Sequence, residues 1–408
     1  MKLRTLAVVM TIAGMGAVAQ PARAVISDDV IRIGFTSDMS GVYADLDGPR
    51  GIEAIRMAIA DSGGEINGKK VELLTLDHQN KPDIAATKAR EWFDQQKIDM
   101  LIGGSNSAVA LALANVANEK KKPFIAIGAG TSELTNGQCT PYTVHYAYDT
   151  IALARGTGSA VVKNGGKSWF FITADYAFGH ALEHDAAAVV KANGGEVKGA
   201  VRVPLSASDF SSYMLQAQAS GAQILGLANA GGDTVNSIKA ANEFGVTPKV
   251  KLAGLLVYIN DIHALGLQAT QGMYLTDFWY WDASDENRAW SKRFEVKYPG
   301  QKPSMNQVAD YSAVMFYLRG VKETNSDDTD IIMKWMKSAK VNDLFAKGGY
   351  VREDGAMIHD MKLMQVKTPA ESKYPWDYYN VIANLKGEDI FNTLAESTCI
   401  PEVSKNRS

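Results

Sequence analysis

Three short segments rich in serine, threonine and glycine are the parts of this sequence best suited to hold a small charged molecule. They are 37–41 (Ser-Asp-Met-Ser-Gly), 103–107 (Gly-Gly-Ser-Asn-Ser) and 128–132 (Gly-Ala-Gly-Thr-Ser). Backbone N–H groups at the start of a helix, aided by a hydroxyl, hold a carboxylate without any basic side chain. We therefore predict a carboxylate site at these loops. Helix capping by the same residues is the alternative interpretation.

The same loops carry only incomplete catalytic motifs. The second loop begins like the nucleophile turn of a hydrolase, but Ser107 stands where the final glycine is required, and no histidine–acid pair is assigned to it. Segment 166–168 ends like a phosphate-binding loop, but Val161 occupies the place of the first glycine. The third loop has Glu133 where a dinucleotide fingerprint needs its third glycine. We therefore expect a protein that is not an enzyme and that needs no cofactor.

A possible metal motif lies further along the chain. His180, Glu183 and His184 match H-x-x-E-H, in which two imidazoles one helical turn apart share a metal ion. A metal enzyme would also need a third ligand from elsewhere and a pocket around it. Surface histidines at the start of a helix explain the same letters, so we expect no metal site here.

The elements that position the loops alternate between short apolar runs and helical patterns. In a first series, strands are expected at 31–36, 71–77, 100–103 and 123–127, and helices at 51–62, 84–95 and 109–118. In a second series, strands are expected at 168–173, 197–203, 223–227 and 251–253, and helices at 179–193, 213–220 and 234–244. Such alternation predicts βαβ units and parallel sheets. The similar local order of 98–117 and 223–241 predicts two related lobes.

The first 24 residues have the features of a cleavable export signal. A positive start at Lys2 and Arg4 precedes a short apolar run and the small-x-small site 22–24. Cleavage is expected after Ala24, with Ala19 as a second possibility and a buried N-terminal helix as the alternative to a signal. Loss of these residues lowers the basic count from 42 to 39 against 45 acids. The mildly acidic product has no basic block that would suggest nucleic acid or an anionic membrane.

The chain has two cysteines, Cys139 and Cys399. Disulfides persist outside the cytoplasm, so a bridge that fastens the C-terminal tail to the loop after 136–137 is expected. Two free thiols are the alternative, because a sequence does not give the distance between two Cα atoms.

Several short motifs, in their order and spacing, resemble the branched-chain-amino-acid-type periplasmic solute-binding proteins of ABC transporters, which have the type I periplasmic binding fold. The likeness covers nearly the whole mature chain, and its motifs lie at 31–36, 39–41, 65–69, 101–107, 132–135, 175–179 and 209–211. The resemblance implies two doubly wound α/β lobes joined by three crossing strands, with the ligand in the cleft. It places the N-terminal lobe at 28–146 plus 278–361, the C-terminal lobe at 147–277 plus 362–392 and a tail at 393–408.

The resemblance also assigns residues to the site. Ser107 matches the family serine that binds the ligand carboxylate, and Ala129 matches a backbone contact beside it. The family's hydroxyl contact aligns with Gly130, for which Thr131 is the neighbouring substitute, and Phe178 falls where a ring of the second lobe covers the ligand. Further candidates come from the loops and from nearby aromatic residues, each of which has core or hinge packing as its alternative role: Tyr43, Ser105, Asn106, Tyr176, Tyr258 and Trp279.

One departure from the family bears on the ligand. Amino-acid binders place an acid just after the strand near Gly254, where it pairs with the ammonium group, and Leu256 stands there in this chain. An unpaired buried ion costs several kcal/mol. We therefore expect an aromatic carboxylic acid of the benzoate or hydroxycinnamate type, with an amino acid or amide as the alternative.

The resemblance further implies a periplasmic protein, expected to be a monomer, that delivers its ligand to the permease subunits of an ABC importer. Two other function classes remain open. One is a ligand sensor that acts through a separate receptor. The other is a hydrolase that uses Ser105.

Overall fold

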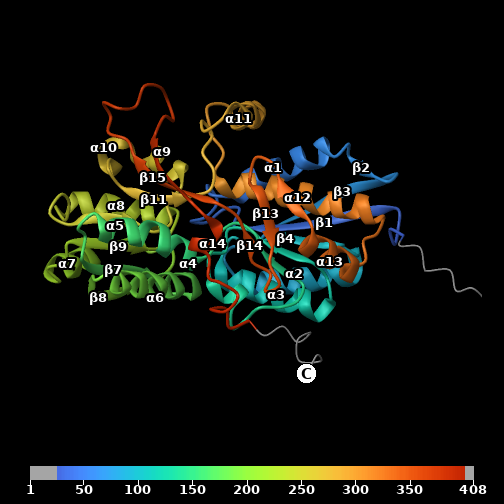
Figure 1. Cartoon of the computed structure of the whole chain (residues 1–408), viewed down its shortest axis with the longest axis horizontal. Helices are drawn as coiled ribbons and strands as arrows, with labels where there is room; N and C mark the ends of the chain where they lie inside the picture. Colours follow the sequence, from blue (N-terminus) through green and yellow to red (C-terminus); the bar gives the residue numbers. More distant parts are fainter. Residues whose placement is uncertain (1–24, 400–408) are drawn as a thin grey trace, which may run out of the picture.

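The computed structural model describes residues 25–399, and the expected export signal lies outside them. The described chain forms two lobes, each built on a mostly or wholly parallel sheet with helices on both faces (Figure 1). The prediction of two doubly wound α/β lobes is confirmed. No helix among the described residues is long and apolar enough to cross a membrane.

The first lobe contains a six-stranded sheet in the order β2-β3-β1-β4-β5-β6. Its strands are β1 (Val30–Ser37), β2 (Glu65–Ile66), β3 (Lys69–Asp77), β4 (Met100–Gly103), β5 (Phe124–Ala126) and β6 (Thr143–His145). All neighbours pair in parallel except β2, which runs antiparallel to β3. The β1 side chains Ile31, Ile33 and Phe35 point to one face and are fully buried, as the period of two predicts.

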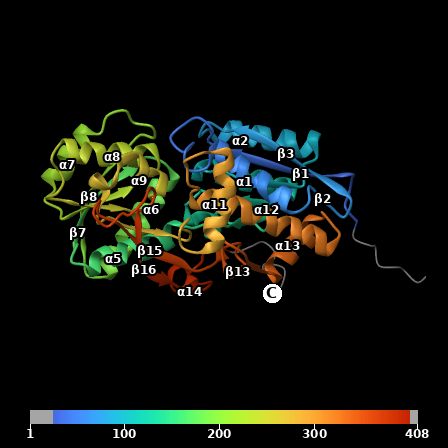
Figure 2. The same cartoon turned by 90° about the horizontal axis from the view of Figure 1, so that it is seen from above.

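Helices cover both faces of this sheet. They are α1 (Gly48–Asp61), α2 (Pro82–Glu91), α3 (Ser107–Lys120), α11 (Asp285–Lys297), α12 (Met305–Thr324) and α13 (Thr329–Ser338). The apolar side chains of α1 and α12 share one core cluster with Ile31 and Phe35 of β1, whereas those of α2 and α3 share another with Leu101 and Phe124. In Figure 2 the late helices α11 and α12 lie beside α1, and α13 lies beside α12, so distant parts of the sequence build one lobe.

The second lobe contains a four-stranded parallel sheet in the order β10-β9-β7-β8. Its strands are β7 (Ser168–Ala174), β8 (Glu196–Val203), β9 (Ile224–Ala228) and β10 (Lys251–Gly254). Its helices are α4 (Thr150–Leu153), α5 (Ser159–Lys163), α6 (Ala177–Ala192), α7 (Ser211–Ala219), α8 (Gly232–Glu243), α9 (Ile259–Leu265) and α10 (Leu267–Thr270). Every residue of β7 is buried, because helices cover both faces of this central strand.

The chain passes between the lobes after β6, after β11 (Tyr274–Asp277) and between β14 (Met357–Ile358) and β15 (Met361–Val366). Hydrogen bonds join the crossing segments to one another. The His359 Nε2 donates to the Ala147 carbonyl at 2.6 Å, and the Lys362 Nζ donates to the Phe278 carbonyl at 3.3 Å. We propose that the lobe boundaries 28–146 plus 278–361 and 147–277 plus 362–392 follow from these crossings.

Several elements were not predicted from the sequence. They include β6, α4, α5, α9, α10, β12 (Lys340–Asn342), β16 (Tyr379–Leu385) and α14 (Gly387–Ile390). All are short, and β16 pairs with β15 beside β11 in a three-stranded antiparallel sheet. A run of three to seven residues gives too little periodicity for assignment.

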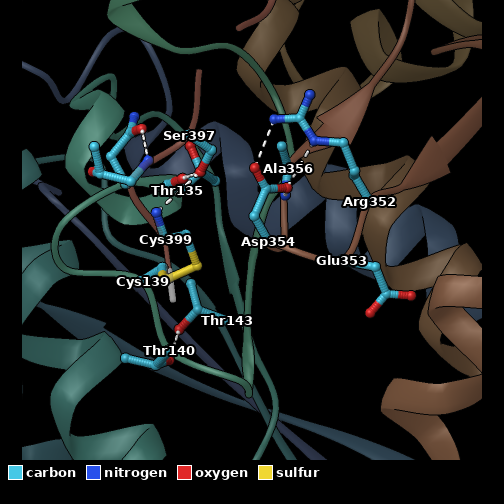
Figure 3. Close-up of a disulfide and its surroundings, with 12 residues drawn as sticks. Thr135, Cys139, Thr140, Thr143, Arg352, Glu353, Asp354, Ala356, Ser397 and Cys399 are labelled. Atoms are coloured by element: carbon cyan, nitrogen blue, oxygen red, sulfur yellow. Dashed lines mark hydrogen bonds and ion pairs between the residues drawn. A yellow bond between two sulfur atoms is a disulfide. The ribbon is translucent and has the colours of Figure 1, made fainter. Parts of the chain in front are cut away.

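The expected disulfide is confirmed, and it fastens the tail that follows α14. Cys139 and Cys399 are bonded, with their Cα atoms 5.6 Å apart. Figure 3 shows Ser397 beside Thr135, where the Ser397 hydroxyl donates to the Thr135 carbonyl at 2.7 Å. The described end of the tail is therefore held on the first lobe both covalently and by hydrogen bonds.

Candidate functional site

A small cavity lies between the lobes, and the volume within it that is open to the centre of a water molecule is about 10 Å³. All but one of its lining residues follow the carboxyl end of a strand, where open α/β sheets collect ligands. The lining is formed by Tyr43, Leu46, Ser105, Ser107, Gly128, Tyr176, Phe178, Ala230, Leu256, Tyr258 and Asn306. The exception is Asn306, which comes from the first turn of α12.

On the first-lobe side, the loop after β4 presents two serines. Ser107 is the first residue of α3, and its Oγ accepts a hydrogen bond from the Thr131 N–H at 3.2 Å. The hydroxyl hydrogen of Ser107 is therefore available to a ligand. The Asn106 Oδ1 accepts from the N–H groups of Ala108 and Val109, at 2.9 and 3.2 Å. Asn106 thus serves as the helix cap, and these two amides are not free for a carboxylate.

The Ser105 hydroxyl makes polar contacts with other residues of the first lobe. Its Oγ accepts from the Asp38 N–H at 3.1 Å and lies 3.1 Å from the Ser37 Oγ and 3.4 Å from the His78 Nε2. Burial lowers the pKa of His78 to about 4, so this imidazole is neutral near pH 7. A hydrolase would need this imidazole as the base for Ser105, and the 3.4 Å separation is long for such a pair.

The segment after β5 lies at the edge of the cavity. The Ala129 carbonyl accepts from the His145 Nε2 at 2.6 Å, and the Gly130 carbonyl accepts from the Thr150 N–H at 2.7 Å. The Thr131 Oγ1 accepts from the Glu133 N–H at 3.4 Å and caps the short 3-10 helix η2 (Ser132–Thr135). These bonds fix the conformation of the loop.

The second lobe supplies the opposite, mainly apolar and aromatic wall. Tyr176 and Phe178 stand at the start of α6, Ala230 follows β9, and Leu256 and Tyr258 follow β10. All except Tyr176 are at most 5% exposed. Leu256, which replaces the acid of amino-acid binders, is therefore part of the lining.

Direct contacts hold the lobes together across the cavity. The Tyr43 and Tyr176 hydroxyls are 2.5 Å apart, and the Gly232 N–H donates to the Val42 carbonyl at 3.0 Å. Gly231, with a φ of 58° and ψ of −133°, takes a conformation open essentially only to glycine and lets this backbone contact form. The structure is therefore that of the closed arrangement.

The lining carries no carboxylate, imidazole, ammonium or guanidinium group. Its polar groups are the hydroxyls of three tyrosines and two serines, together with the Asn306 amide. Burial raises the pKa of Tyr43, Tyr176 and Tyr258, so all three are neutral hydroxyls at physiological pH. The Asn306 Oδ1 is buried and has no hydrogen-bond partner within the described protein. Such a set of neutral groups suits an anionic ligand, which accepts hydrogen bonds from the hydroxyls.

The structure brings together six of the residues predicted for the site: Tyr43, Ser105, Ser107, Tyr176, Phe178 and Tyr258. The remaining five predicted residues, Asn106, Ala129, Gly130, Thr131 and Trp279, are not among the lining. The Trp279 ring packs edge-on against Trp290 of α11, with centroids 5.9 Å apart, and is buried. The role of each lining residue in binding remains a prediction.

Five lining residues were not among the predicted site residues: Leu46, Gly128, Ala230, Leu256 and Asn306. Leu256 was singled out in the sequence only as the residue that replaces an acid. Gly128 was part of the third serine- and glycine-rich loop, so only its individual role was missed. Ala230 follows β9 as Ser105 follows β4, and the similarity of the two series could have indicated it. Asn306 gave no local signal, because only the packing of α12 on α1 brings this late helix to the cleft.

The H-x-x-E-H segment has other uses in the structure. Glu183 accepts from the Thr173 hydroxyl at 2.5 Å and pairs with Arg202 at 3.1 Å. His180 is paired with Asp175 at 2.8 Å on the surface. Among the described residues no group of three potential metal ligands comes together.

Comparison with known proteins is consistent with this geometry. The family model described as "Periplasmic binding protein" matches residues 30–373. The crystal structure of a periplasmic binding protein from Burkholderia mallei has 62% sequence identity and a TM-score of 0.90, and the match covers 91% of this chain and 98% of that one.

Two more distant relatives differ in what they are said to bind. A solute-binding protein of an ABC transporter from Rhodopseudomonas palustris, solved in complex with p-hydroxybenzoic acid, is 25% identical with a TM-score of 0.79, over 88% of this chain and 98% of that one. The curated Leu/Ile/Val-binding protein homolog 6 of Brucella melitensis is 27% identical over 267 residues, which is 64% of this chain and 67% of the relative.

Proposed function

This chain belongs to the periplasmic binding protein family, and from that premise we propose that it captures a benzoate-type aromatic carboxylate between its lobes and delivers it to the permease of an ABC importer. Its place of action in this proposal is the periplasm, reached through the export signal expected at residues 1–24.

The observation that carries the ligand class is the absence of any acidic side chain from the cavity lining, with Leu256 at the position of the expected acid. The ammonium group of an amino acid would enter this cavity without a carboxylate partner. Leaving one ion of a buried pair unpartnered costs roughly 3–5 kcal/mol. An aromatic acid carries no ammonium group and avoids that cost.

The remaining features suit the two ends of such a molecule. Ser107, with its hydroxyl hydrogen free, supplies a charge-assisted hydrogen bond to the carboxylate. Phe178 and Leu256 supply apolar surface to the ring. The unpartnered Asn306 Oδ1 accepts a hydrogen bond from a ring hydroxyl, and p-hydroxybenzoic acid carries one.

Delivery follows from lobe closure. A ligand that contacts Ser107 of the first lobe and Phe178 of the second binds the closed form better than the open form and shifts the population toward it. The closed pair of lobes is then the form that the permease recognises.

An amino acid is the second candidate, because the Brucella relative carries the name Leu/Ile/Val-binding protein homolog. In this chain the ammonium group would have to be held by neutral acceptors alone, such as the Asn306 Oδ1. The two candidate ligands differ in whether they carry an ammonium group, and the fold is compatible with both.

Isothermal titration calorimetry of the protein without residues 1–24 tests the proposal. Binding of 4-hydroxybenzoate or benzoate, with no heat from leucine, isoleucine, valine or phenylalanine, is the expected result. The reverse preference would overturn the ligand class while leaving the family intact.

A variant series then tests the carboxylate anchor. Ser107→Ala is expected to weaken binding by roughly 1–3 kcal/mol, because a buried carboxylate loses one hydroxyl donor. The matched control is Ser212→Ala on the exposed side of α7, which should bind as the wild type does. Equal affinity of both variants would place the anchor elsewhere.

A further inference from the structure

Two carboxyl groups face each other in the core of the first lobe. Asp47 precedes α1, Asp310 lies in α12, and both are 0% exposed. A Cβ atom on Gly51 would stand 2.8 Å from the Asp310 Oδ2 and closer still to the Asp47 Oδ1. The two oxygens therefore crowd one small space, which the missing side chain of Gly51 leaves open.

Neither carboxyl has the partners that a buried ion needs. The Asp47 Oδ2 accepts from the Ser37 hydroxyl at 2.9 Å, but the Asp47 Oδ1 and both oxygens of Asp310 have no hydrogen-bond donor among the described residues. No basic side chain of the described chain pairs with either of them. The titratable groups around them are Asp38, from the loop after β1, and Tyr148, from the first crossing segment. Two ionised carboxylates could not share this space, because like charges in contact and out of water repel strongly.

The pair is connected to the ligand cavity through two serines. The Ser37 Oγ that donates to Asp47 lies 3.1 Å from the Ser105 Oγ, and Ser105 lines the cavity. On its other side Ser105 lies 3.4 Å from the neutral imidazole of His78. All of these groups are buried, so their hydrogen bonds form one chain without competition from bulk water.

We propose that Asp47 and Asp310 share one buried proton, and that the protonated pair is a positioning element that fixes Ser37 and Ser105 at the wall of the ligand cavity. The first half concerns the protein alone. The second half rests on the proposed function, since it concerns ligand affinity.

The direction of the titration agrees with the geometry. Burial raises the pKa of Asp47, and burial together with the charge of Asp47 raises the pKa of Asp310 well above its usual value. Carboxyls with raised native pKa values bind more protons in the folded than in the unfolded state. Their contribution to stability is therefore lost as the pH rises from about 4 through their native pKa values.

Infrared difference spectroscopy tests the shared proton without any ligand. The spectrum of the wild type minus that of Asp310→Asn at pH 7 should contain the C=O stretch of a protonated carboxylic acid. The variant lacks this band, because an amide stands in place of the protonated carboxyl group. The matched control is Asp45→Asn in the same loop, whose exposed carboxylate should give no such band. Absence of the band from the Asp310 difference spectrum would overturn the shared proton.

Affinity for 4-hydroxybenzoate tests the positioning role. Asp310→Asn should bind within about twofold of the wild type, since the amide still donates to Asp47, whereas Asp310→Ala should bind about tenfold more weakly. Ser37→Ala provides a second route in case the alanine variant does not fold. It should weaken binding to the same extent and leave the carboxylic acid band in place.

The outcomes separate the two proposals. Wild-type affinity in both Asp310→Ala and Ser37→Ala would overturn the positioning role. Failure of the wild type to bind any aromatic acid would overturn the proposed function, and the infrared experiment would still decide whether the proton is shared.

Discussion

Gly130 of the first lobe lies directly against the ring of Phe178 of the second lobe. A Cβ atom on Gly130 would stand 2.8 Å from the Phe178 Cε2 and 3.0 Å from its Cδ2. Phe178 is only 3% exposed, so its ring has little room to withdraw. The absence of a side chain at position 130 therefore determines how closely the two lobes approach each other beside the cavity.

Gly130→Ser, which restores the hydroxyl expected from the family resemblance, should hinder lobe closure and weaken ligand binding by about tenfold or more. Small-angle scattering of the ligand-saturated variant should show a larger radius of gyration than that of the wild type. Gly158→Ala is the matched control, because its Cβ would make an ordinary 3.5 Å contact with Val189.

A double-mutant cycle shows whether the effect acts through the ring. Adding Phe178→Ala to Gly130→Ser should recover closure, because the serine then meets open space. If the two substitutions are additive in the free energy of binding, the Gly130–Phe178 contact does not control closure.

Leu256→Glu should weaken the binding of aromatic carboxylates and strengthen the binding of amino acids. The new carboxylate would lie in the cavity wall, where it repels an aromatic carboxylate and attracts an ammonium group. We expect the affinity for 4-hydroxybenzoate to fall at least about a hundredfold, as one unpaired buried charge costs roughly 3 kcal/mol. Calorimetry against leucine and phenylalanine measures the gain.

The neutral isostere separates charge from size in this experiment. Leu256→Gln introduces a side chain as long as glutamate but without its charge, so it should lose less affinity for the aromatic acid and gain none for amino acids. Equal behaviour of the glutamate and glutamine variants would show that shape, and not charge, sets the ligand class.

The lobes could be predicted from the sequence because their long strands and helices carry strong periodic patterns. The alternation of the apolar Ile31, Ile33 and Phe35 with Arg32, Gly34 and Thr36 is one such pattern. The short helices α9 and α10 were missed, since four to seven residues make only about one to two turns. Their positions depend on tertiary packing, which local propensity does not record.

The site was predictable to the extent that it follows strand ends. Ser105 and Ser107 were found because they stand in a run of small residues that leads from β4 into the first turn of α3. Asn306 was missed because its helix begins some 200 residues later and reaches the cleft only by packing on α1. Trp279 was included for its aromatic type, but the sequence could not show that its ring packs against Trp290 of α11 and not against the cavity.

The tail after α14 connects both lobes beside the crossing segments. Arg155 of the second lobe donates to the Phe391 carbonyl at 2.9 Å and pairs with Glu396 at 3.0 Å. The following residues end at the disulfide between Cys399 and Cys139 of the first lobe. The bond closes a loop with a sequence separation of 260, so it removes much chain entropy from the unfolded state.

The double variant Cys139→Ser/Cys399→Ser should therefore lose about 2–4 kcal/mol of unfolding free energy. Chemical denaturation measures this loss, and dithiothreitol should lower the stability of the wild type toward that of the variant. The reductant should leave the variant itself unchanged, which serves as the control. An unaltered midpoint in the variant would mean that the non-covalent tail contacts suffice.

His359 ties two of the crossing segments together as a neutral imidazole. Its Nε2 donates to the Ala147 carbonyl at 2.6 Å, and its Nδ1 lies 3.0 Å from the Asp360 carbonyl. The rings of Phe278 and Phe345 pack against it, at centroid distances of 5.3 and 4.5 Å. Burial lowers the pKa of His359 to about 4, against the favourable effect of its carbonyl partners.

Because the unfolded chain takes up a proton on this histidine near pH 6.5 and the folded chain only near pH 4, His359 should cost stability progressively as the pH falls between these values. His359→Gln keeps a donor but does not titrate. The difference in unfolding free energy, variant minus wild type, should therefore rise by about 2–4 kcal/mol from pH 7.5 to pH 4. Denaturant titrations at several pH values measure it, and His184→Gln on the exposed side of α6 is the control. Parallel curves for His359→Gln and the wild type would mean that this imidazole is protonated as readily in the folded protein as in the unfolded one.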